Sequence, residues 1–328
     1  MNTMRRSHAA EGRHRGYGTG GVGTRRTGRK RKAPKAAALH APVISPGTDE
    51  RTKLESGTMK AASPAQSKGA RWRPPARRGT LSVIVSAQNE EATLPAVLRE
   101  AERLLPEELI VVLNGCSDES YLRARQTAMA MVVHYPDAAG HDVGRAIGAR
   151  LSRGDILLFL DGDIAIPAPA LAPFVTAVDE GADVALNDLN PLLPSFEHTD
   201  PVTRCKLFLN LAVGREDLGA SSMTAVPHAL SRRALSIIGP KTLMVPPKAQ
   251  AAAVLNGLIV KNASSVNVIG RNRVRRSNTG AGNAVEQMIL GDHAEALAEI
   301  LARGGVRKFR EAGGPGFRSR LAAWRNQP

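Results

Sequence analysis

The sequence is poor in cysteine and in long apolar runs, and each shortage excludes a class of protein. Its two cysteines, Cys116 and Cys205, are too few for a disulfide framework or a cysteine-rich zinc module, and they fit a reducing compartment. No run of about eighteen consecutive apolar residues occurs, so we expect no membrane-spanning helix. The basic N-terminus also lacks the apolar stretch of a secretory signal. We therefore expect a cytoplasmic protein, and leave open a peripheral contact with the inner face of the membrane.

Acidic residues are scarce in the first quarter of the chain. Residues 1–79 contain 19 Lys and Arg against 4 Asp and Glu, which accounts for the whole formal net charge of +15. The remaining 249 residues carry 26 charges of each sign and are formally neutral. The high isoelectric point therefore reflects the first quarter alone, and it gives no reason to expect a nucleic-acid partner for the rest.

Apolar periodicity is also nearly absent from this first quarter. Its composition, rich in Gly, Arg, Ala, Ser, Thr and Pro, cannot bury enough surface to offset the entropy of ordering, so we predict a disordered basic tail over residues 1–79. The run Arg29–Lys32 could contact anionic lipid or nucleic acid, but we favour a solvated tail. Translation could also begin at Met59. We expect a folded domain over residues 80–302 and a second basic tail over residues 303–328.

Apolar runs and helical spacings alternate through the rest of the chain. Strands are predicted at residues 81–86, 109–113, 129–134, 155–160, 183–186, 223–226 and 265–269. Helices are predicted at residues 94–105, 143–151, 170–179, 202–213, 231–238, 250–258 and 283–302. Such alternation predicts an α/β fold with a mostly parallel central sheet and flanking helices.

Polar residues follow three of the predicted strands, at the point where each strand ends. These segments are Ala87–Glu91, Asn114–Asp118 and Asp161–Asp163. In open α/β sheets, ligands bind beyond the carboxyl ends of the strands. The three segments are therefore predicted to lie together at one ligand site.

Asp161 and Asp163 are the most informative pair in these segments. Residues two apart in an extended chain point to the same side, and Gly162 between them allows a ligand to approach closely. Two neighbouring carboxylates repel each other unless a positive charge is present. Mg²⁺ or Mn²⁺ holding a diphosphate would supply that charge. An ordinary Asp-Gly turn is the alternative reading of these three residues alone.

In chain order, these segments resemble the family 2 glycosyltransferases. The segment 86–91 is similar to the family's Pro-Ala-Tyr-Asn-Glu-Glu, with Ser86 and Gln88 in place of its Pro and Tyr. The segment 114–118 resembles its Asp-Gly-Ser-Thr-Asp turn, with Asn and Cys in place of the first Asp and of Ser. The Asp-Gly-Asp of residues 161–163 stands where the family has Asp-x-Asp.

The resemblance runs from Leu81 to about Ile166 and more loosely to Gly270. It implies the GT-A fold, a Rossmann-like fold of nucleotide-diphospho-sugar transferases. It also implies a hexosyltransferase that moves a sugar from a nucleotide-sugar donor, a UDP-sugar, to an acceptor that is unknown. The acceptor could be a cell-envelope glycan, a lipid or a small molecule.

Roles for single residues follow from the same resemblance. Residues at family positions that contact the nucleotide are Ala87, Glu90, Asn114, Asp118, Arg145 and Asp161. Asp163, together with Asp161, would coordinate Mg²⁺ or Mn²⁺ at the diphosphate. Plainer roles remain for two of these residues, because Glu90 could favour a helix N-terminus and Asp118 could cap the following helix.

No catalytic base is identified. Inverting members of the family have a carboxylate shortly after a segment like Arg232–Gly239, where this chain has Val245–Gln250 without one. Glu216 and Asp217 lie upstream of that segment, and Asp188 and His228 are possible substitutes that we do not assign. Either the base comes from elsewhere, or the enzyme is retaining, or its catalysis departs from the family's.

Two further candidate features lie downstream of these segments. Arg271–Arg276 could clamp a phosphate or form a solvated loop, and His293 could be a metal ligand, although Asp292 and Glu295 beside it resemble a capping box.

A sugar nucleotidyltransferase or a dehydrogenase would need a glycine-rich loop after the first strand, which is absent. A non-catalytic binding protein on a transferase scaffold is the third rival, because the base is missing.

Overall fold

The structure is a computed structural model that describes residues 72–268 and 283–313, without the side chains of 304–313, and a few isolated positions from residue 316 onward. By its contacts the chain divides into two units, residues 1–66 and 67–328, and every described residue belongs to the second. The predicted disorder of the tail therefore falls outside the described residues up to Arg71.

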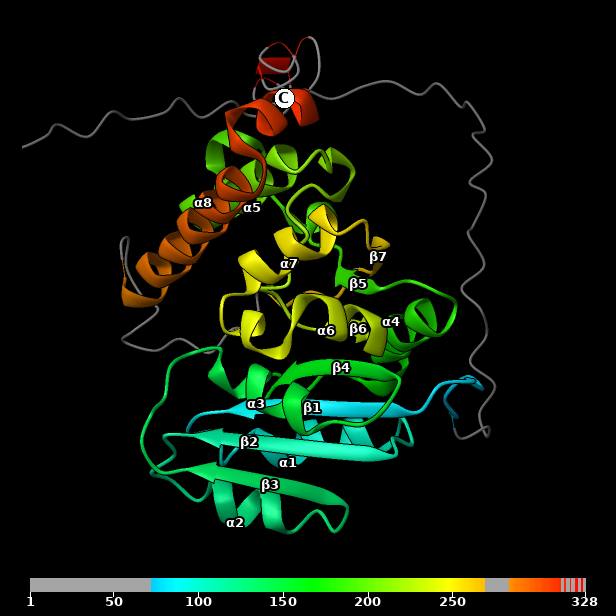
Figure 1. Cartoon of the computed structure of the whole chain (residues 1–328). Coiled ribbons are helices and arrows are strands. Elements are labelled where there is room, and N and C mark those ends of the chain that lie inside the picture. The colour runs from blue at the N-terminus through cyan, green and yellow to red at the C-terminus, as the bar shows by residue number, and fades with distance from the viewer. Residues whose placement is uncertain are drawn as a thin grey trace, which may run out of the picture. The chain divides into compact units, whose positions relative to one another are not determined.

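A sheet of seven strands forms the centre of the second unit (Figure 1). In spatial order the strands are β3 (Ala130–Tyr135), β2 (Glu108–Asn114), β1 (Leu81–Ala87), β4 (Ile156–Asp161), β6 (His228–Ser231), β5 (Val184–Asn187) and β7 (Val260–Ser264). All neighbours pair in parallel except β6, which runs antiparallel to both β4 and β5. The predicted α/β fold with a mostly parallel sheet is confirmed.

Helices cover both faces of the sheet, which explains the continuous apolar runs of β1 and β4. Val83 and Val85 belong to one core and Ile84 to the other, because successive side chains of a strand point to opposite faces. The first core is closed by α1 (Leu94–Glu102) and α4 (Ala168–Asp179). The second is closed by α3 (Val143–Leu151), α6 (Arg232–Ile238) and α7 (Pro246–Leu255).

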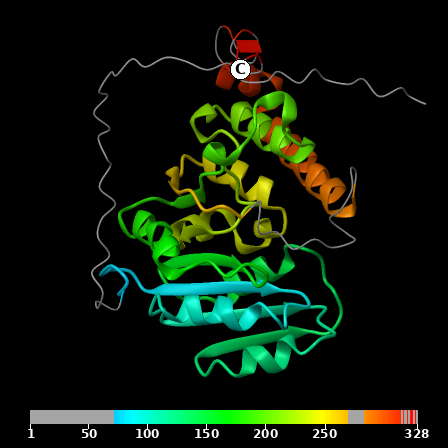
Figure 2. The same cartoon turned by 180° about the vertical axis from the view of Figure 1, so that it is seen from behind.

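Two longer helices lie beyond the second core. α8 (Ala284–Gly313) packs against α5 (Pro201–Ala212) and α7, as Figures 1 and 2 show from opposite sides. A small apolar cluster of Leu209, Ala251, Ala296 and Ile300 joins the three helices. α8 continues past residue 302, the predicted end of the domain.

Short elements fill the connections between these helices and strands. They are α2 (Ser120–Arg125) and the single 3₁₀ turns Asn190–Leu192, Phe196–His198, Glu216–Leu218 and Pro240–Met244. α7 begins at Pro246 rather than at the predicted residue 250, because proline is well suited to the first turn of a helix.

Two strand predictions were wrong. Residues 223–226 form a turn before the cis Val226–Pro227 bond, and the strand of this region is β6. The amide of Met223 donates to the side chain of Gln250 (2.8 Å), so it is not available to a strand partner. The strand predicted at 265–269 is also absent from its described part. The amide of Val266 donates to the side chain of Asn187 (2.8 Å), and β7 ends at Ser264.

Two glycines of α3 allow this helix to lie directly on β1. A Cβ added at Gly144 would stand 2.7 Å from Ser86 Oγ, and one added at Gly148 would overlap Ile84 Cγ2. Any larger residue would force the helix away from the strand. The close approach carries the first turn of α3, with Arg145, to the carboxyl end of β1.

Candidate functional site

A cleft opens at the carboxyl ends of β1 and β4. The chain moves outward from β1 through β2 to β3 and then returns to β4 on the other side of β1, so the strand order reverses between β1 and β4. Crevices at such reversals are the usual ligand sites of open α/β sheets. The cleft is lined by Ser86, Ala87, Gln88, Glu90, Asn114, His141, Asp142, Gly144, Arg145, Asp161, Gly162 and Asp163.

Six of the seven residues predicted for the site therefore line one cleft. Only Asp118 does not. His141 and Asp142 also line the cleft and were not predicted from the sequence. Their one signal was their place just before the Gly144-Arg145 pair, at the N-terminus of a predicted helix.

The Asp161–Asp163 turn is locked against the end of β1. The amide of Gly162 donates to the carbonyl of Ser86 (2.8 Å), and its own carbonyl accepts from Thr93 Oγ1 (2.8 Å). A Cβ on Gly162 would lie 2.6 Å from Ala87 Cβ, so the close contact requires glycine here. Both carboxylates are thereby held at the mouth of the cleft by the backbone of β1.

Arg145 is the central cation of the cleft. Its side chain is 5% exposed and lies 3.0 Å from Asp142 Oδ1 and 3.2 Å from Asp161 Oδ2. It also donates to the carbonyl of Met223 (3.2 Å). Burial would lower the pKa of Arg145, but the charges of Asp142, Asp161 and Asp163 together raise it. The guanidinium thus links helix α3, the Asp161–Asp163 turn and the segment before β6.

Negative charge exceeds positive charge among the side chains that line the cleft. Four carboxylates, those of Glu90, Asp142, Asp161 and Asp163, face a single arginine. Carboxylate oxygens at the end of a strand suit Mg²⁺ or Mn²⁺, which take part of their shell from phosphate oxygens and water. No group of three or more His, Cys, Asp or Glu converges on one point within the described residues. Asp161 and Asp163 therefore fit a metal that is shared with a bound diphosphate.

The loops after β1 and β2 are joined by side-chain hydrogen bonds. Asn89, in the left-handed region with φ 58°, accepts from the amide of Ser117 (2.8 Å). Asp118 accepts from the amides of Glu91 and Ser120, both at 3.0 Å. Burial raises the pKa of Asp118, but its hydrogen bonds from Ser120 and Glu91 outweigh this effect and lower it. This structure gives Asp118 a bridging role, and its contact with a base stays a prediction.

Glu90 and Asn114 are fixed in the cleft wall by hydrogen bonds. Glu90 is 2% exposed, its amide donates to Ser120 Oγ (2.8 Å), and its carboxylate accepts from Thr93 Oγ1 (3.3 Å). Asn114 accepts from the amide of Ala139 (2.8 Å) and donates to the carbonyl of Gly140 (2.5 Å). Asn114 thus holds the loop that leads to His141 and Asp142.

A buried amide network holds the segment Gly219–Met223 opposite the strand ends. Asn210 of α5 donates to the carbonyls of Gly219 (2.7 Å) and Ser221 (2.9 Å). Gln250 of α7 donates to Asn210 Oδ1 (2.6 Å) and accepts from the amide of Met223. The carbonyl that reaches Arg145 is therefore fixed by two helices distant in sequence.

The residues considered as substitutes for a catalytic base lie outside the cleft. His228 is 1% exposed, and its ring stacks on that of Phe159 with centroids 5.0 Å apart. Burial, together with the charge of Arg145, lowers the pKa of His228 to about 3. Asp188 accepts from the amide group of Asn190 (2.8 Å), and Asp217 pairs with Arg215 (2.7 Å). No base is assigned.

α8 brings two further titratable residues near the cleft. Burial raises the pKa of Asp292 to about 6, helped by the charges of Asp142 and Glu295 and opposed by His141. His293 is 1% exposed, its Nδ1 lies 2.7 Å from the carbonyl of Ile289, and no residue that the structure describes gives its Nε2 a hydrogen bond. Burial lowers the pKa of His293 to about 4, so the ring is neutral at pH 7.

The capping box suggested around Asp292 and Glu295 was wrong, because both residues lie inside α8. The cap of α8 is Asn283, whose side chain accepts from the amide of Glu286 (2.9 Å). Arg271–Arg276, the other downstream candidate, lies outside the described residues.

Comparison with known proteins identifies relatives of the cleft-bearing segment. The sequence model described as glycosyl transferase family 2 matches residues 82–189. Glucosyl-3-phosphoglycerate synthase of Mycobacterium tuberculosis is 33% identical over 108 residues, which are 29% of this chain and 32% of that protein. Undecaprenyl-phosphate 4-deoxy-4-formamido-L-arabinose transferase of Pseudomonas aeruginosa is 31% identical over 114 residues, 32% of this chain and 34% of that protein. The chain thus spans about a third of the length of these curated relatives.

Solved structures extend the likeness beyond that segment. The M. tuberculosis glucosyl-3-phosphoglycerate synthase in complex with UDP superposes with a TM-score of 0.50 at 21% identity, covering 69% of this chain and 87% of that one. The same enzyme with phosphoglyceric acid gives a TM-score of 0.51 at 21% identity, covering 67% and 80%. At 21% identity, the similarity to these structures shows the fold alone. Residues 82–189 thus match glycosyl transferase family 2 within a GT-A fold, which confirms the family resemblance and the fold expected from the sequence.

Proposed function

We propose that this protein is a glycosyltransferase that moves a sugar from a UDP-sugar to an acceptor, with Mg²⁺ or Mn²⁺ as cofactor. One observation carries the proposal. Asp161 and Asp163 meet Arg145, Glu90 and Asn114 in a single cleft at the strand-order reversal, inside the segment that matches family 2.

Each wall of the cleft has a distinct task in this reaction. Residues Ala87–Glu90 and Asn114 would hold the nucleoside, and Arg145 would keep Asp161 in place. The metal, held by Asp161 and Asp163, would stabilise the negative charge that develops on the departing diphosphate. Without a cation, four carboxylates beside one arginine would repel a diphosphate.

The relatives support the donor and leave the acceptor open. By their names, one forms glucosyl-3-phosphoglycerate and another transfers a substituted arabinose to undecaprenyl phosphate, and a solved structure of the first holds UDP. The acceptor of this chain could be a small molecule, a lipid or an envelope glycan. Because the chain spans about a third of these relatives' length, its whole activity remains a proposal.

A cytoplasmic location, with peripheral contact at the membrane, belongs to the same proposal. Both cysteines are free, which suits a reducing compartment. No helix in the part of the chain that the structure describes is long and apolar enough to cross a bilayer. A membrane role for the basic tail predicts weaker binding to anionic vesicles when residues 1–71 are removed, and equal binding would exclude it.

Thermal unfolding with Mn²⁺ and a panel of nucleoside diphosphates tests the donor site. A ligand at a hundred times its dissociation constant stabilises by about 2.7 kcal/mol. We expect UDP to raise the melting temperature only with Mn²⁺, and Asp163→Asn to abolish the rise. Glu180→Gln, an exposed change at the end of α4, is the matched control and should behave as wild type.

Other outcomes separate the alternatives. A response to a different nucleotide would keep the reaction class and change the donor. Binding of UDP without any sugar transfer or donor hydrolysis would favour a non-catalytic binding protein, in line with the absence of an assigned base. A sugar nucleotidyltransferase would instead respond to a nucleoside triphosphate. No response to any nucleotide would refute the proposal.

A further inference from the structure

Lys206 of α5 is a half-buried lysine that is not among the residues lining the cleft. None of the described residues gives its ammonium group a hydrogen bond or an ion pair within 4.0 Å. A partly desolvated charge without a partner costs free energy, and lysines are rarely buried unless they are paired. A partly buried ammonium group without a partner suggests that it binds an anionic ligand or has another functional role.

Helix geometry turns Lys206 toward the segment Gly219–Met223. It lies four residues before Asn210, so the two side chains share one face of α5. Asn210 donates to the carbonyls of Gly219 and Ser221, and Met223 of the same segment accepts from Arg145. The face of α5 that carries Lys206 is therefore the face turned to the segment that contacts Arg145.

Charge interactions agree with this placement. Burial lowers the pKa of Lys206 to about 8, Asp200 opposes this effect, and the charge of Arg145 adds to it. The charge of Lys206 in turn helps to lower the pKa of His293 on α8. The charge of Lys206 thus acts on Arg145 of the cleft and on His293 of α8, and with a pKa of about 8 Lys206 is mostly protonated at pH 7.

Arg145 and Lys206 differ in the negative charges that balance their positive charge. Arg145 is within 3.2 Å of carboxylates from both Asp142 and Asp161. Among the described residues, Asp200 alone supplies a negative charge that raises the pKa of Lys206, and the charge of Arg145 opposes it. A phosphate group would remove this imbalance, because it is compact, carries up to two charges and accepts hydrogen bonds from an ammonium group.

We propose that Lys206 binds a phosphate group of a substrate in the active-site cleft. The inference rests on the proposed function, which offers two sources of such a group. One is the diphosphate of the nucleotide donor, and the other is a phosphorylated acceptor. Both would place phosphate between the strand ends and α5.

Two binding measurements on the full chain distinguish the sources. The first is titration with UDP in the presence of Mn²⁺, and the second is titration with inorganic phosphate after saturation with UDP and Mn²⁺. Lys206→Met should weaken binding at least tenfold in one titration, and Lys206→Arg should retain most of it. Loss in the first identifies the donor diphosphate, and loss in the second identifies a phosphorylated acceptor.

Lys261→Met on β7 is the matched control, because it removes the same charge from an exposed position away from the cleft. Unchanged binding of Lys206→Met in both titrations would overturn the inference. Should that variant fail to fold, Lys206→Gln replaces it in the same titrations. If wild type binds phosphate but not UDP, the proposed function fails, while the phosphate titration still decides the role of Lys206. If it binds neither, both fail.

Discussion

At the scale of single residues, Arg145 has the largest number of tasks in the cleft. Its guanidinium contacts two carboxylates and one carbonyl from three separate segments, and it is nearly fully buried. A buried cation of this kind is costly to desolvate and is tolerated because its partners are close and well oriented. Its presence also lets Asp161 and Asp163 remain side by side when no metal is bound.

Replacing Arg145 with Met should therefore destabilise the protein by about 3 kcal/mol, because it leaves the buried Asp142 and the partly exposed Asp161 without their counter-charge. Mn²⁺ should restore part of the loss, since the metal would supply positive charge to Asp161 and Asp163. Urea unfolding with and without Mn²⁺ measures both effects.

Arg150→Met is the control for Arg145→Met, as it removes an exposed arginine from the same helix and should change little. An equal loss of stability in Arg145→Met with and without Mn²⁺ would contradict the proposed metal site.

At the scale of elements, the distance between α3 and β1 sets the shape of the cleft. Gly148 packs against Ile84 without room for a methyl group, whereas within the described parts of the chain a Cβ added at Gly291 of α8 would meet nothing within 4 Å. The two glycines therefore differ in whether a side chain would fit at their position. One is required by packing, and the other weakens a helix.

The same change at these two positions should have opposite effects. Gly148→Ala should lower the free energy of unfolding by about 1–3 kcal/mol through overpacking. Gly291→Ala should raise it by about 0.5–1 kcal/mol, because alanine has the higher helix propensity. Urea unfolding of both variants tests the pair, and a stabilising Gly148→Ala would show that α3 can shift from the sheet.

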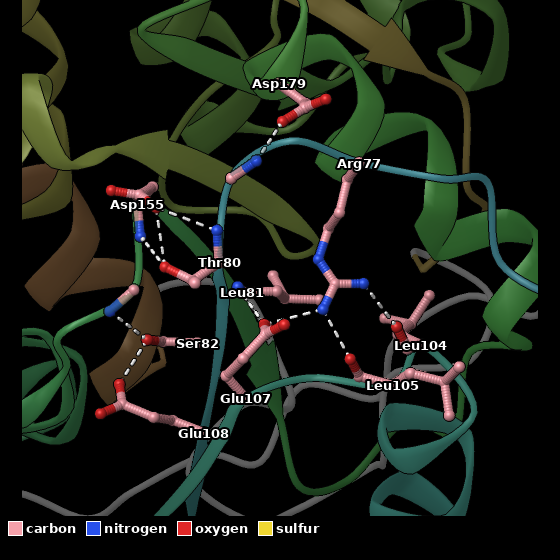
Figure 3. Close-up of polar contacts among 12 residues, drawn as sticks. Arg77, Thr80, Leu81, Ser82, Leu104, Leu105, Glu107, Glu108, Asp155 and Asp179 are labelled. Carbon is pink, nitrogen blue, oxygen red and sulfur yellow. Dashed lines mark hydrogen bonds and ion pairs between the residues drawn. The ribbon is translucent and has the colours of Figure 1, made fainter.

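At the scale of the whole molecule, carboxylates fasten the amino-terminal edge of the sheet (Figure 3). Glu107 accepts from the amide of Leu81 (2.6 Å) and from Arg77 (2.7 Å), and Asp179 accepts from the amide of Gly79 (2.8 Å). Arg77 also donates to the carbonyls of Leu104 and Leu105. The residues just before β1, assigned to the tail by sequence, are thus bound to the domain.

Acid should loosen this edge. Burial raises the pKa of Glu107, but the hydrogen bonds from Leu81 and Arg77 outweigh it, so its pKa is lowered from 4.5. The amide of Gly79 is the main cause that lowers the pKa of Asp179 from 3.8. A lowered carboxylate pKa stabilises the fold above the pKa of the unfolded chain, and this contribution is lost as the pH falls through the lowered value.

We therefore expect the stability contributed by Glu107 and Asp179 to be full at pH 6–7 and to fall progressively below about pH 4.5. Urea unfolding of wild type and Glu107→Gln across this range tests the origin of the effect. The difference between the two proteins should shrink as the pH falls. A difference that stays constant down to pH 3 would assign the role of Glu107 to packing rather than to charge.

The sequence by its own pattern specified the strands from Leu81 to Asp161 and most of the cleft. Strands buried on both faces must be continuous apolar runs, so residues 81–86, 109–113 and 155–160 were recognisable one by one. Parallel strands end at one edge, so the polar residues after them had to meet there. Asp161, Asp163, Glu90 and Asn114 came together for this reason.

Tertiary structure alone decided the opposite side of the cleft. The strand at His228–Ser231, the turn before it and the placement of Lys206, Asp292 and His293 depend on how α5, α7 and α8 pack. No local pattern encodes these contacts, because they join residues far apart in the chain through side-chain amides and small apolar clusters. Periodicity specifies which face of a helix is buried, but the partner of that face is selected only when the whole core closes.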